Sequence, residues 1–128
     1  MKTFKNKWNN RAVEDAGCYM SKEAISFCTA FKNMLKREGK AKGFEVVACK
    51  SGHYDLYGFV KRGDIYIYVS FDIPRWGSRI DFEKYGTDGV LVRYAQNEKD
   101  YKGECNHFCK LSELPEKLSE MFERRERA

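Results

Sequence analysis

The sequence predicts an α+β domain, in which an antiparallel sheet of four to five strands carries an N-terminal and a C-terminal helix. Three observations predict this class. Side chains alternate between apolar and polar over residues 52–72, and apolar residues recur at helical spacing over 21–38 and again over 112–126. A chain of 128 residues is long enough to bury roughly two-thirds of its unfolded surface in one core. We therefore interpret residues 1–128 as a single domain.

Residues 52–72 read as two strands joined by a tight turn at 61–64. Gly63 allows the positive φ that a hairpin turn with a bulge requires. The aliphatic side chains of both strands fall on one face, which needs an apolar cover. The opposite face, called the tyrosine face below, carries Tyr57, Phe59, Tyr66 and Tyr68.

The helix over 21–38 begins at Ser21, a good N-cap, and ends before Gly39. Its basic residues Lys22, Lys32, Lys36 and Arg37 lie mostly off the apolar stripe. The helix over 112–126 has Pro115 in its first turn, where proline is tolerated. The two helices flank a sheet over 44–95, with strands at 44–50 and 90–95 and an irregular edge strand at 80–85.

The rest of the chain is predicted as a basic aromatic arm over 1–12, a short helix over 11–16 and a long loop over 96–110. Structureless loops of this length tend to be functional in small domains. Two arrangements of the main helices fit the sequence. If both helices lie on the aliphatic face, the tyrosine face is open to a partner, whereas one helix on each face would bury it.

The charge balance limits the classes of partner. Lys and Arg number 24 and Asp and Glu number 19, which gives a net charge of +5. This excess permits contact with nucleic acid or an acidic partner and excludes a DNA mimic. We find no apolar run of spanning length and no signal-peptide core, so we expect a cytoplasmic protein. The odd count of five cysteines predicts free thiols.

Two groups of cysteine and histidine residues raise the question of a zinc site. Thiolate and imidazole are the ligands that Zn²⁺ prefers, and four would complete a tetrahedron. The spacing differs from that of zinc ribbons and fingers, so the sequence favours buried thiols and a hydrogen-bonded histidine. The candidate ligands are Cys49, His53, Cys105, His107 and Cys109.

The sequence does not predict an enzyme. A cysteine near His53 or His107, oriented by Asp55 or Asn106, would be a nucleophilic arrangement, but nothing in the sequence brings these residues together. We find no glycine-rich nucleotide loop and no zinc-protease motif. Exposed rings beside Lys61, Arg62 and other basic residues would suit base stacking, and the alternative is that the rings pack under a helix or a dimer partner.

Four segments resemble small proteins carried by phages and conjugative elements of Gram-positive bacteria. They are WNNRA at 8–12, GHYDLYGF at 52–59, RGDIYIYVSFDIPR at 62–75 and RYAQNEKDYKGECNHF at 93–108. Proteins of this size and setting include anti-CRISPR inhibitors of Cas9-type effectors and other counter-defence proteins. The chain departs from the pattern at Cys105 and Cys109, where the resemblance implies small residues, and this weakens the zinc hypothesis.

Together with the small size, the absent catalytic motifs and the tyrosine face, the resemblance favours a non-enzymatic inhibitor in the bacterial cytoplasm that binds a host immunity protein, with a Cas9-type effector as the leading candidate. We expect no cofactor and no membrane. The alternative is a single-stranded nucleic-acid-binding protein of a phage or plasmid. A homodimer is compatible with either. Aromatic and arginine anchors carry most of the binding energy in interfaces. The expected contact residues are Tyr57, Phe59, Tyr66, Tyr68, Arg75, Trp76, Arg79 and Arg93.

Overall fold

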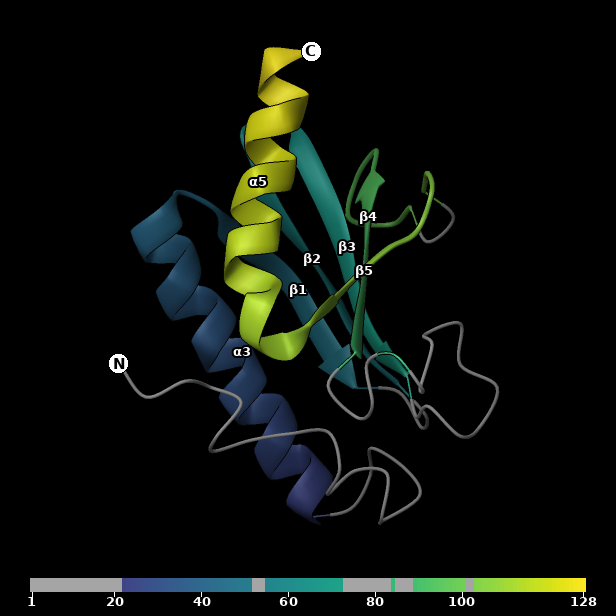
Figure 1. The fold of residues 1–128 in the computed structure, drawn as a ribbon. Helices are drawn as coiled ribbons and strands as arrows, with labels where there is room; N and C mark the ends of the chain where they lie inside the picture. The colour runs from purple at the N-terminus through teal and green to yellow at the C-terminus, as the bar shows by residue number, and fades with distance from the viewer. Residues whose placement is uncertain (1–21, 52–54, 73–83, 85–88, 101–102) are drawn as a thin grey trace.

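The computed structural model describes residues 22–51, 55–72, 84, 89–100 and 103–128, and it confirms the predicted α+β class (Figure 1). A long helix precedes a five-stranded antiparallel sheet, and a second helix follows it. The elements are α3 (Lys22–Lys42), β1 (Glu45–Ser51), β2 (Asp55–Arg62), β3 (Ile65–Asp72), β4 (Gly89–Ala95), β5 (His107–Lys110), the 3₁₀ helix η3 (Leu111–Glu113) and α5 (Leu114–Arg127).

The sheet follows the chain, with the strand order β1-β2-β3-β4-β5. The β2–β3 pairing ends with Arg62 opposite Ile65, so Gly63 and Asp64 form a two-residue turn. Gly63 has a φ of 58°, which a tight hairpin with glycine at its first central position requires. The predicted hairpin is thus confirmed. The irregularity expected at the turn lies instead in β1, where the register shifts between Val46 and Ala48.

Both helices lie on the same face of the sheet, which decides between the two arrangements that the sequence allows (Figure 1). The core between helices and sheet combines side chains from all three parts, including Met34 of α3, Ile67 of β3 and Phe122 of α5, each at most 2 % exposed. The period-two pattern of the strands and the helical stripes therefore converge on one hydrophobic layer.

Helix α3 ends four residues later than predicted, at Lys42. Gly39 lies inside the helix because it packs against Phe44, and a Cβ at this position would collide with the Phe44 carbonyl oxygen. The residue that ends the helix is Gly43, which has a φ of 82°. The backbone N–H groups of Gly43 and Phe44 both donate to the Gly39 carbonyl, at 2.7 and 2.9 Å, as at a typical glycine C-cap.

The predicted loop over 96–110 is wrong in its last part, because His107–Lys110 forms β5 and pairs with β4. The part of the loop over 96–100 is closed by the Asp100 carboxylate. It accepts hydrogen bonds from the backbone N–H groups of Gln96 at 2.9 Å and Gly103 at 2.8 Å. The C-terminal helix is confirmed, with Pro115 in its first turn.

The predicted arm over 1–12, the short helix over 11–16 and the edge strand over 80–85 lie outside the described residues, except for Lys84. Of the helices in the described part of the chain, none is both long enough and apolar enough to cross a bilayer.

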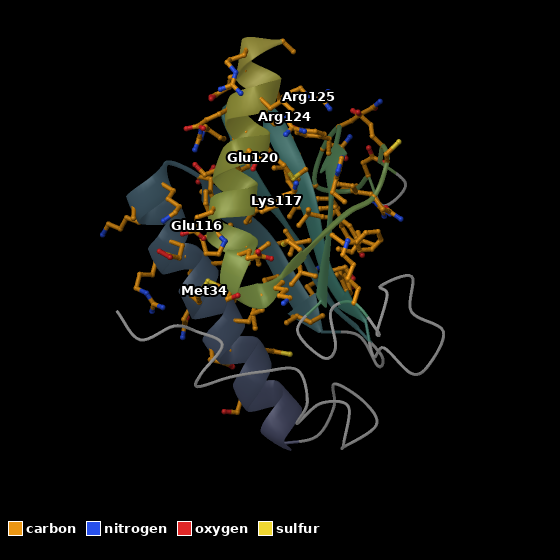
Figure 2. All side chains as sticks on the ribbon, in the orientation of Figure 1. Met34, Glu116, Lys117, Glu120, Arg124 and Arg125 are labelled. Atoms are coloured by element: carbon orange, nitrogen blue, oxygen red, sulfur yellow. The ribbon has the colours of Figure 1, made fainter. Side chains whose placement is uncertain are left out.

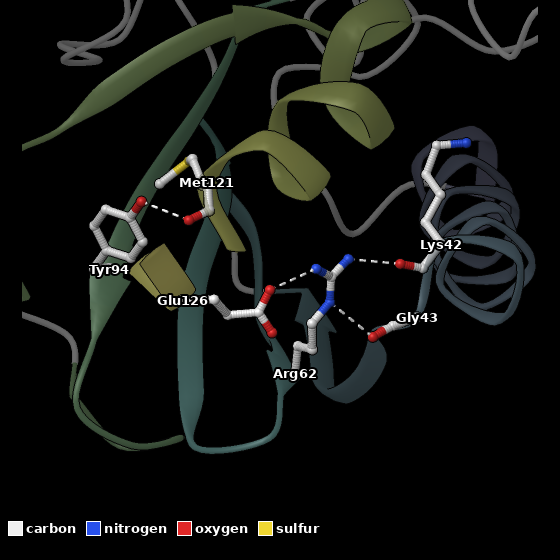
Figure 3. A network of polar contacts seen from close by, with 6 residues as sticks. All are labelled: Lys42, Gly43, Arg62, Tyr94, Met121 and Glu126. Carbon is white, nitrogen blue, oxygen red and sulfur yellow. Dashed lines mark hydrogen bonds and ion pairs between the residues drawn. The ribbon is translucent and has the colours of Figure 1, made fainter. Parts of the chain in front are cut away.

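Arg62 connects the ends of three elements (Figure 3). Its guanidinium donates to the backbone carbonyls of Lys42 at 2.6 Å and Gly43 at 3.0 Å, and it pairs with the Glu126 carboxylate at 3.2 Å. It also lies 5.1 Å from the centre of the Phe122 ring. The charged fork thus satisfies carbonyls at the C-terminus of α3 while it holds the last turns of α5 against the hairpin.

Candidate interaction surfaces

The tyrosine face lies on the side of the sheet opposite both helices. The strand register aligns Phe59, Tyr68 and Arg93 in one row across β2, β3 and β4. The ring centres of Phe59 and Tyr68 are 5.2 Å apart, and the Arg93 guanidinium lies 4.5 Å from the Tyr68 ring centre. Arg93 also donates a 3.1 Å hydrogen bond to the Asn106 side-chain carbonyl. The row is therefore a cation–π stack within the protein.

This row is closed to solvent, so the expectation that its rings are available to a partner is wrong. Phe59 is 1 % exposed, Tyr68 is 5 % exposed and Arg93 is 4 % exposed. Together with the buried Leu91 and the half-buried Phe108, they form a second, smaller apolar cluster. Phe59 and Tyr68 also make further interactions within the chain. These side chains stabilise the fold rather than form a surface.

The two other rings of the tyrosine face, Tyr57 and Tyr66, are half-buried. Lys61 lies 5.8 Å from the Tyr66 ring centre and forms a 3.3 Å ion pair with the Glu45 carboxylate. The predicted contact residues Arg75, Trp76 and Arg79 lie outside the described residues. Of the eight predicted contact residues, Tyr57 and Tyr66 are thus those that the structure describes as partly accessible.

The candidate zinc ligands do not form one site. Cys49 is on β1 and Cys109 is on β5, at opposite edges of the sheet. Four strand spacings separate these edges, on the order of 19 Å, and one ion cannot bridge that distance. Cys105 is exposed, and the half-buried His107 lies edge-on to Tyr94 with the ring centres 6.5 Å apart. Among the described residues no group of three potential ligands converges on a point, and His53 lies outside them.

Two of the cysteines are held in the protonated form. Burial raises the pKa of the Cys49 thiol to about 11, although the nearby Lys32 and Lys36 lower it. Burial also raises the pKa of the Cys109 thiol to about 12, and the Glu113 carboxylate adds to this effect. The thiolate is the reactive form of cysteine, so neither side chain is suited to nucleophilic chemistry near neutral pH.

The outer side of α3 carries a different surface, called the basic face below and defined by Lys32, Lys36, Arg37 and Lys40. Residues three and four apart lie together on a helix, so these four cations share one side of its C-terminal half. Lys36, Arg37 and Lys40 are exposed and Lys32 is half-buried. Glu38 is nearby in sequence, but it is 8 % exposed and forms its ion pair with Lys42.

The positive charge of the basic face is not offset by carboxylates among the described residues. None of the four forms an ion pair among the residues that the structure describes. On α5, in contrast, Arg124 pairs with Glu120 at 2.7 Å and Arg125 pairs with Glu104 at 2.9 Å. An exposed set of uncompensated cations on a rigid helix attracts an anionic partner.

A groove of about 530 Å³ lies between the β5 edge of the sheet and α5. Figure 2 shows Glu116, Lys117 and Glu120 along α5. The lining combines an apolar ring and thiol with a mainly acidic rim; it consists of Phe108, Cys109, Ser112, Glu113, Glu116, Lys117 and Glu120.

Sequence reasoning identified neither surface as a site. Helical spacing already separates Lys32, Lys36 and Arg37 from the apolar stripe of α3, and this pattern was the available signal for the basic face. The groove had no such signal, because it depends on β5 packing beside α5. No family model, curated protein or solved structure matches this chain in the three comparisons made.

Proposed function

We propose that the chain is a non-enzymatic binding protein from a mobile genetic element, which inhibits a bacterial immunity effector in the cytoplasm of the host. The resemblance over 52–75 and 93–108 supports this class and implies a Cas9-type nuclease as the target. The inhibitor acts stoichiometrically, by occupying a surface of the effector or by holding the effector in an inactive arrangement.

The observation that supports this proposal best is the basic face of α3. Three of its four cations are exposed, and the helix that carries them is anchored by Phe31, Met34 and Leu35, each 2 % exposed. A rigid element presents charges without a large loss of conformational entropy on binding. Complementary charges at an interface mainly accelerate association and select the partner.

The positive charge of the basic face limits which surfaces of the effector the inhibitor can bind. A basic face is repelled by the positively charged channel in which a guided nuclease holds its nucleic acid. It is attracted to an acidic surface of the effector or to nucleic acid already bound there. The half-buried Tyr57 and Tyr66 remain candidate contacts, as do Arg75, Trp76 and Arg79, whereas Phe59, Tyr68 and Arg93 are assigned to the fold.

A pull-down with Cas9, with and without guide RNA, tests the proposal. The informative variant replaces Lys36, Arg37 and Lys40 by Glu, and it should lose most of the capture. A control with the same change in net charge replaces Lys99, Lys110 and Arg127, which are exposed on other elements, and it should be captured like the wild type. Equal capture of both variants, or no capture of the wild type, contradicts the proposal.

The second candidate function is a nucleic-acid-binding accessory protein of a phage or plasmid. The uncompensated cations of the basic face favour it, since they suit phosphates as well as carboxylates. The burial of Phe59 and Tyr68 removes two of the expected stacking rings. This function predicts that the chain retards a single-stranded oligonucleotide at low salt, that added salt abolishes the complex, and that the α3 variant does not bind. Binding to Cas9 alone, without retardation of the oligonucleotide, would exclude it.

A further inference from the structure

The groove between β5 and α5 differs in charge from the rest of the chain. The protein has a net charge of +5, yet the groove lining contains three carboxylates and one ammonium group. Glu116 forms no ion pair among the described residues, and Glu120 shares an exposed pair with Arg124. The groove therefore offers a locally negative surface on a basic protein.

The arrangement of the carboxylates is linear. Glu113 is the last residue of η3 and the N-cap of α5, and Glu116 and Glu120 follow it in the first two turns of α5, over about 10 Å at 1.5 Å per residue. The described part of the chain contains no group of three or more side chains that could surround a metal ion, and these carboxylates therefore belong to none. Like charges at spacings of three and four residues repel each other on a helix. Lys117 lies in the same stretch and Arg124 pairs with Glu120, so this repulsion is partly offset within the chain. A ligand with several cations along its length neutralises the remaining negative charge better than a single ion.

The groove lining also includes two apolar residues of β5, the half-buried Phe108 and the buried Cys109. Burial and the Glu113 carboxylate together raise the pKa of the Cys109 thiol. The Glu113 carboxylate thus lies beside this apolar wall of the groove. Such a wall binds aliphatic groups, including the stems of lysine and arginine side chains, in addition to their charges.

The position of the groove suits an extended segment. β5 is the last strand of the sheet, and the backbone N–H of Lys110 donates to the Glu113 carboxylate at 3.0 Å. The helix borders the groove on one side and the strand on the other. A second copy docked groove to groove would bring its own carboxylates against these, so charge disfavours that occupant.

We propose that this groove binds an extended peptide segment of a partner protein that carries lysine or arginine side chains alternating with apolar ones. The carboxylates of Glu113, Glu116 and Glu120 receive the cations, and Phe108 and Cys109 contact the aliphatic groups. This site is separate from the basic face of α3 and does not depend on the identity of the inhibited effector.

The test uses a fluorescein-labelled, end-capped octapeptide of alternating lysine and valine, and it measures fluorescence anisotropy with the full chain. We expect saturable binding that weakens as salt rises. Glu116→Lys with Glu120→Lys should weaken binding about tenfold or more. The control Asp64→Lys with Glu98→Lys makes the same charge change at exposed positions outside the groove, and its affinity should stay within about twofold of the wild type. Circular dichroism checks that each variant is folded.

Three further measurements separate the alternatives. A glutamate–valine octapeptide should not bind, and the polyamine spermine should compete poorly because it lacks branched apolar groups. Equal binding of spermine, unchanged affinity in the groove variant or no binding of the lysine–valine peptide at about 1 mM would overturn the proposal. Sedimentation that shows self-association, abolished by the groove variant, would overturn it in favour of a second copy as the occupant.

Discussion

The hydroxyl group of Tyr94 donates a 2.7 Å hydrogen bond to the backbone carbonyl of Met121, across the interface between β4 and α5 (Figure 3). Both residues are buried, and the Arg125 guanidinium lies 3.8 Å from the centre of the Tyr94 ring. The phenol thus joins the C-terminal helix to the sheet with a polar contact that water cannot replace.

Tyr94→Phe should lower the free energy of unfolding by about 1–3 kcal/mol, because it leaves the Met121 carbonyl without this buried donor. Urea denaturation measures the change. The matched control is Tyr66→Phe, which removes a hydroxyl group from a half-buried ring and should change stability by less than about 0.5 kcal/mol. Equal effects of the two substitutions would show that the Tyr94–Met121 bond does not stabilise the fold.

Arg62→Lys should destabilise the protein by about 1–3 kcal/mol, although it keeps the charge. Lysine cannot reproduce the forked donation to Lys42, Gly43 and Glu126 or the flat contact with Phe122. The neighbouring Lys61→Ala removes the pair with Glu45 and the contact with the Tyr66 ring, and it should cost less than about 1 kcal/mol. Thermal unfolding of both variants tests this contrast, and a fully stable Arg62→Lys protein would contradict it.

Gly39→Ala should destabilise the protein, which is the opposite of the usual effect of this change inside a helix. Alanine normally gains roughly 1 kcal/mol over glycine there, but a Cβ at position 39 collides with the Phe44 carbonyl oxygen. Asn33→Ala, at an exposed position of the same helix, should instead stabilise slightly by propensity. A gain in melting temperature for both variants would contradict the close packing of Gly39 against Phe44.

The half-buried Cys49 and the buried Cys109 should make stability fall at alkaline pH. Below the ordinary thiol pKa of 9.0 both states are protonated at Cys49 and Cys109. As pH rises from 9.0 towards 11, the unfolded chain loses these protons while the folded chain keeps them, because the folded pKa values are about 11 and 12. The unfolded state then binds fewer protons, so the free energy of unfolding decreases with pH.

Urea denaturation between pH 8 and 10.5 measures this slope, and Cys49→Ala with Cys109→Ala should make it shallower. Alkylation at pH 8 followed by peptide mass spectrometry provides an independent check. The exposed Cys105 should react well before Cys49 and Cys109. Similar rates at all three cysteines would show that the Cys49 and Cys109 thiols are as accessible as Cys105 in the native state.

The hairpin, the strands at 45–51 and 89–95 and the C-terminal helix were predictable from sequence, because their signals are local. Alternation in 55–72 and helical spacing in 114–127 depend only on near neighbours. The end of α3 was not predictable from sequence, since Gly39 and Gly43 can both act as C-caps. The choice between them depends on how Phe44 packs. Strand β5 has four residues and is too short for its alternation to be distinguished from a loop.

For the tyrosine face, the direction of the side chains was predictable from sequence, whereas their burial was not. The sequence correctly places Tyr57, Phe59, Tyr66 and Tyr68 on one side of the hairpin. Phe59 and Tyr68, however, are buried in a cluster that includes Leu91, and Arg93 stacks on Tyr68; both partners come from β4, which is distant in sequence. Long-range pairing of this kind leaves no periodic signal. Three residues of the basic face, Lys32, Lys36 and Arg37, depend only on helical spacing and could have been proposed from the sequence. Lys40 joins them only because α3 continues to Lys42.

The most direct test of the central claim is a titration of Cas9–guide RNA cleavage of a DNA target with the purified chain. We predict that cleavage stops at about one chain per effector, as for a stoichiometric inhibitor. The variant with Lys36, Arg37 and Lys40 replaced by Glu should shift the titration to at least about tenfold higher concentration, while the control with Lys99, Lys110 and Arg127 replaced should not. Complete cleavage in the presence of excess wild-type chain would contradict the account.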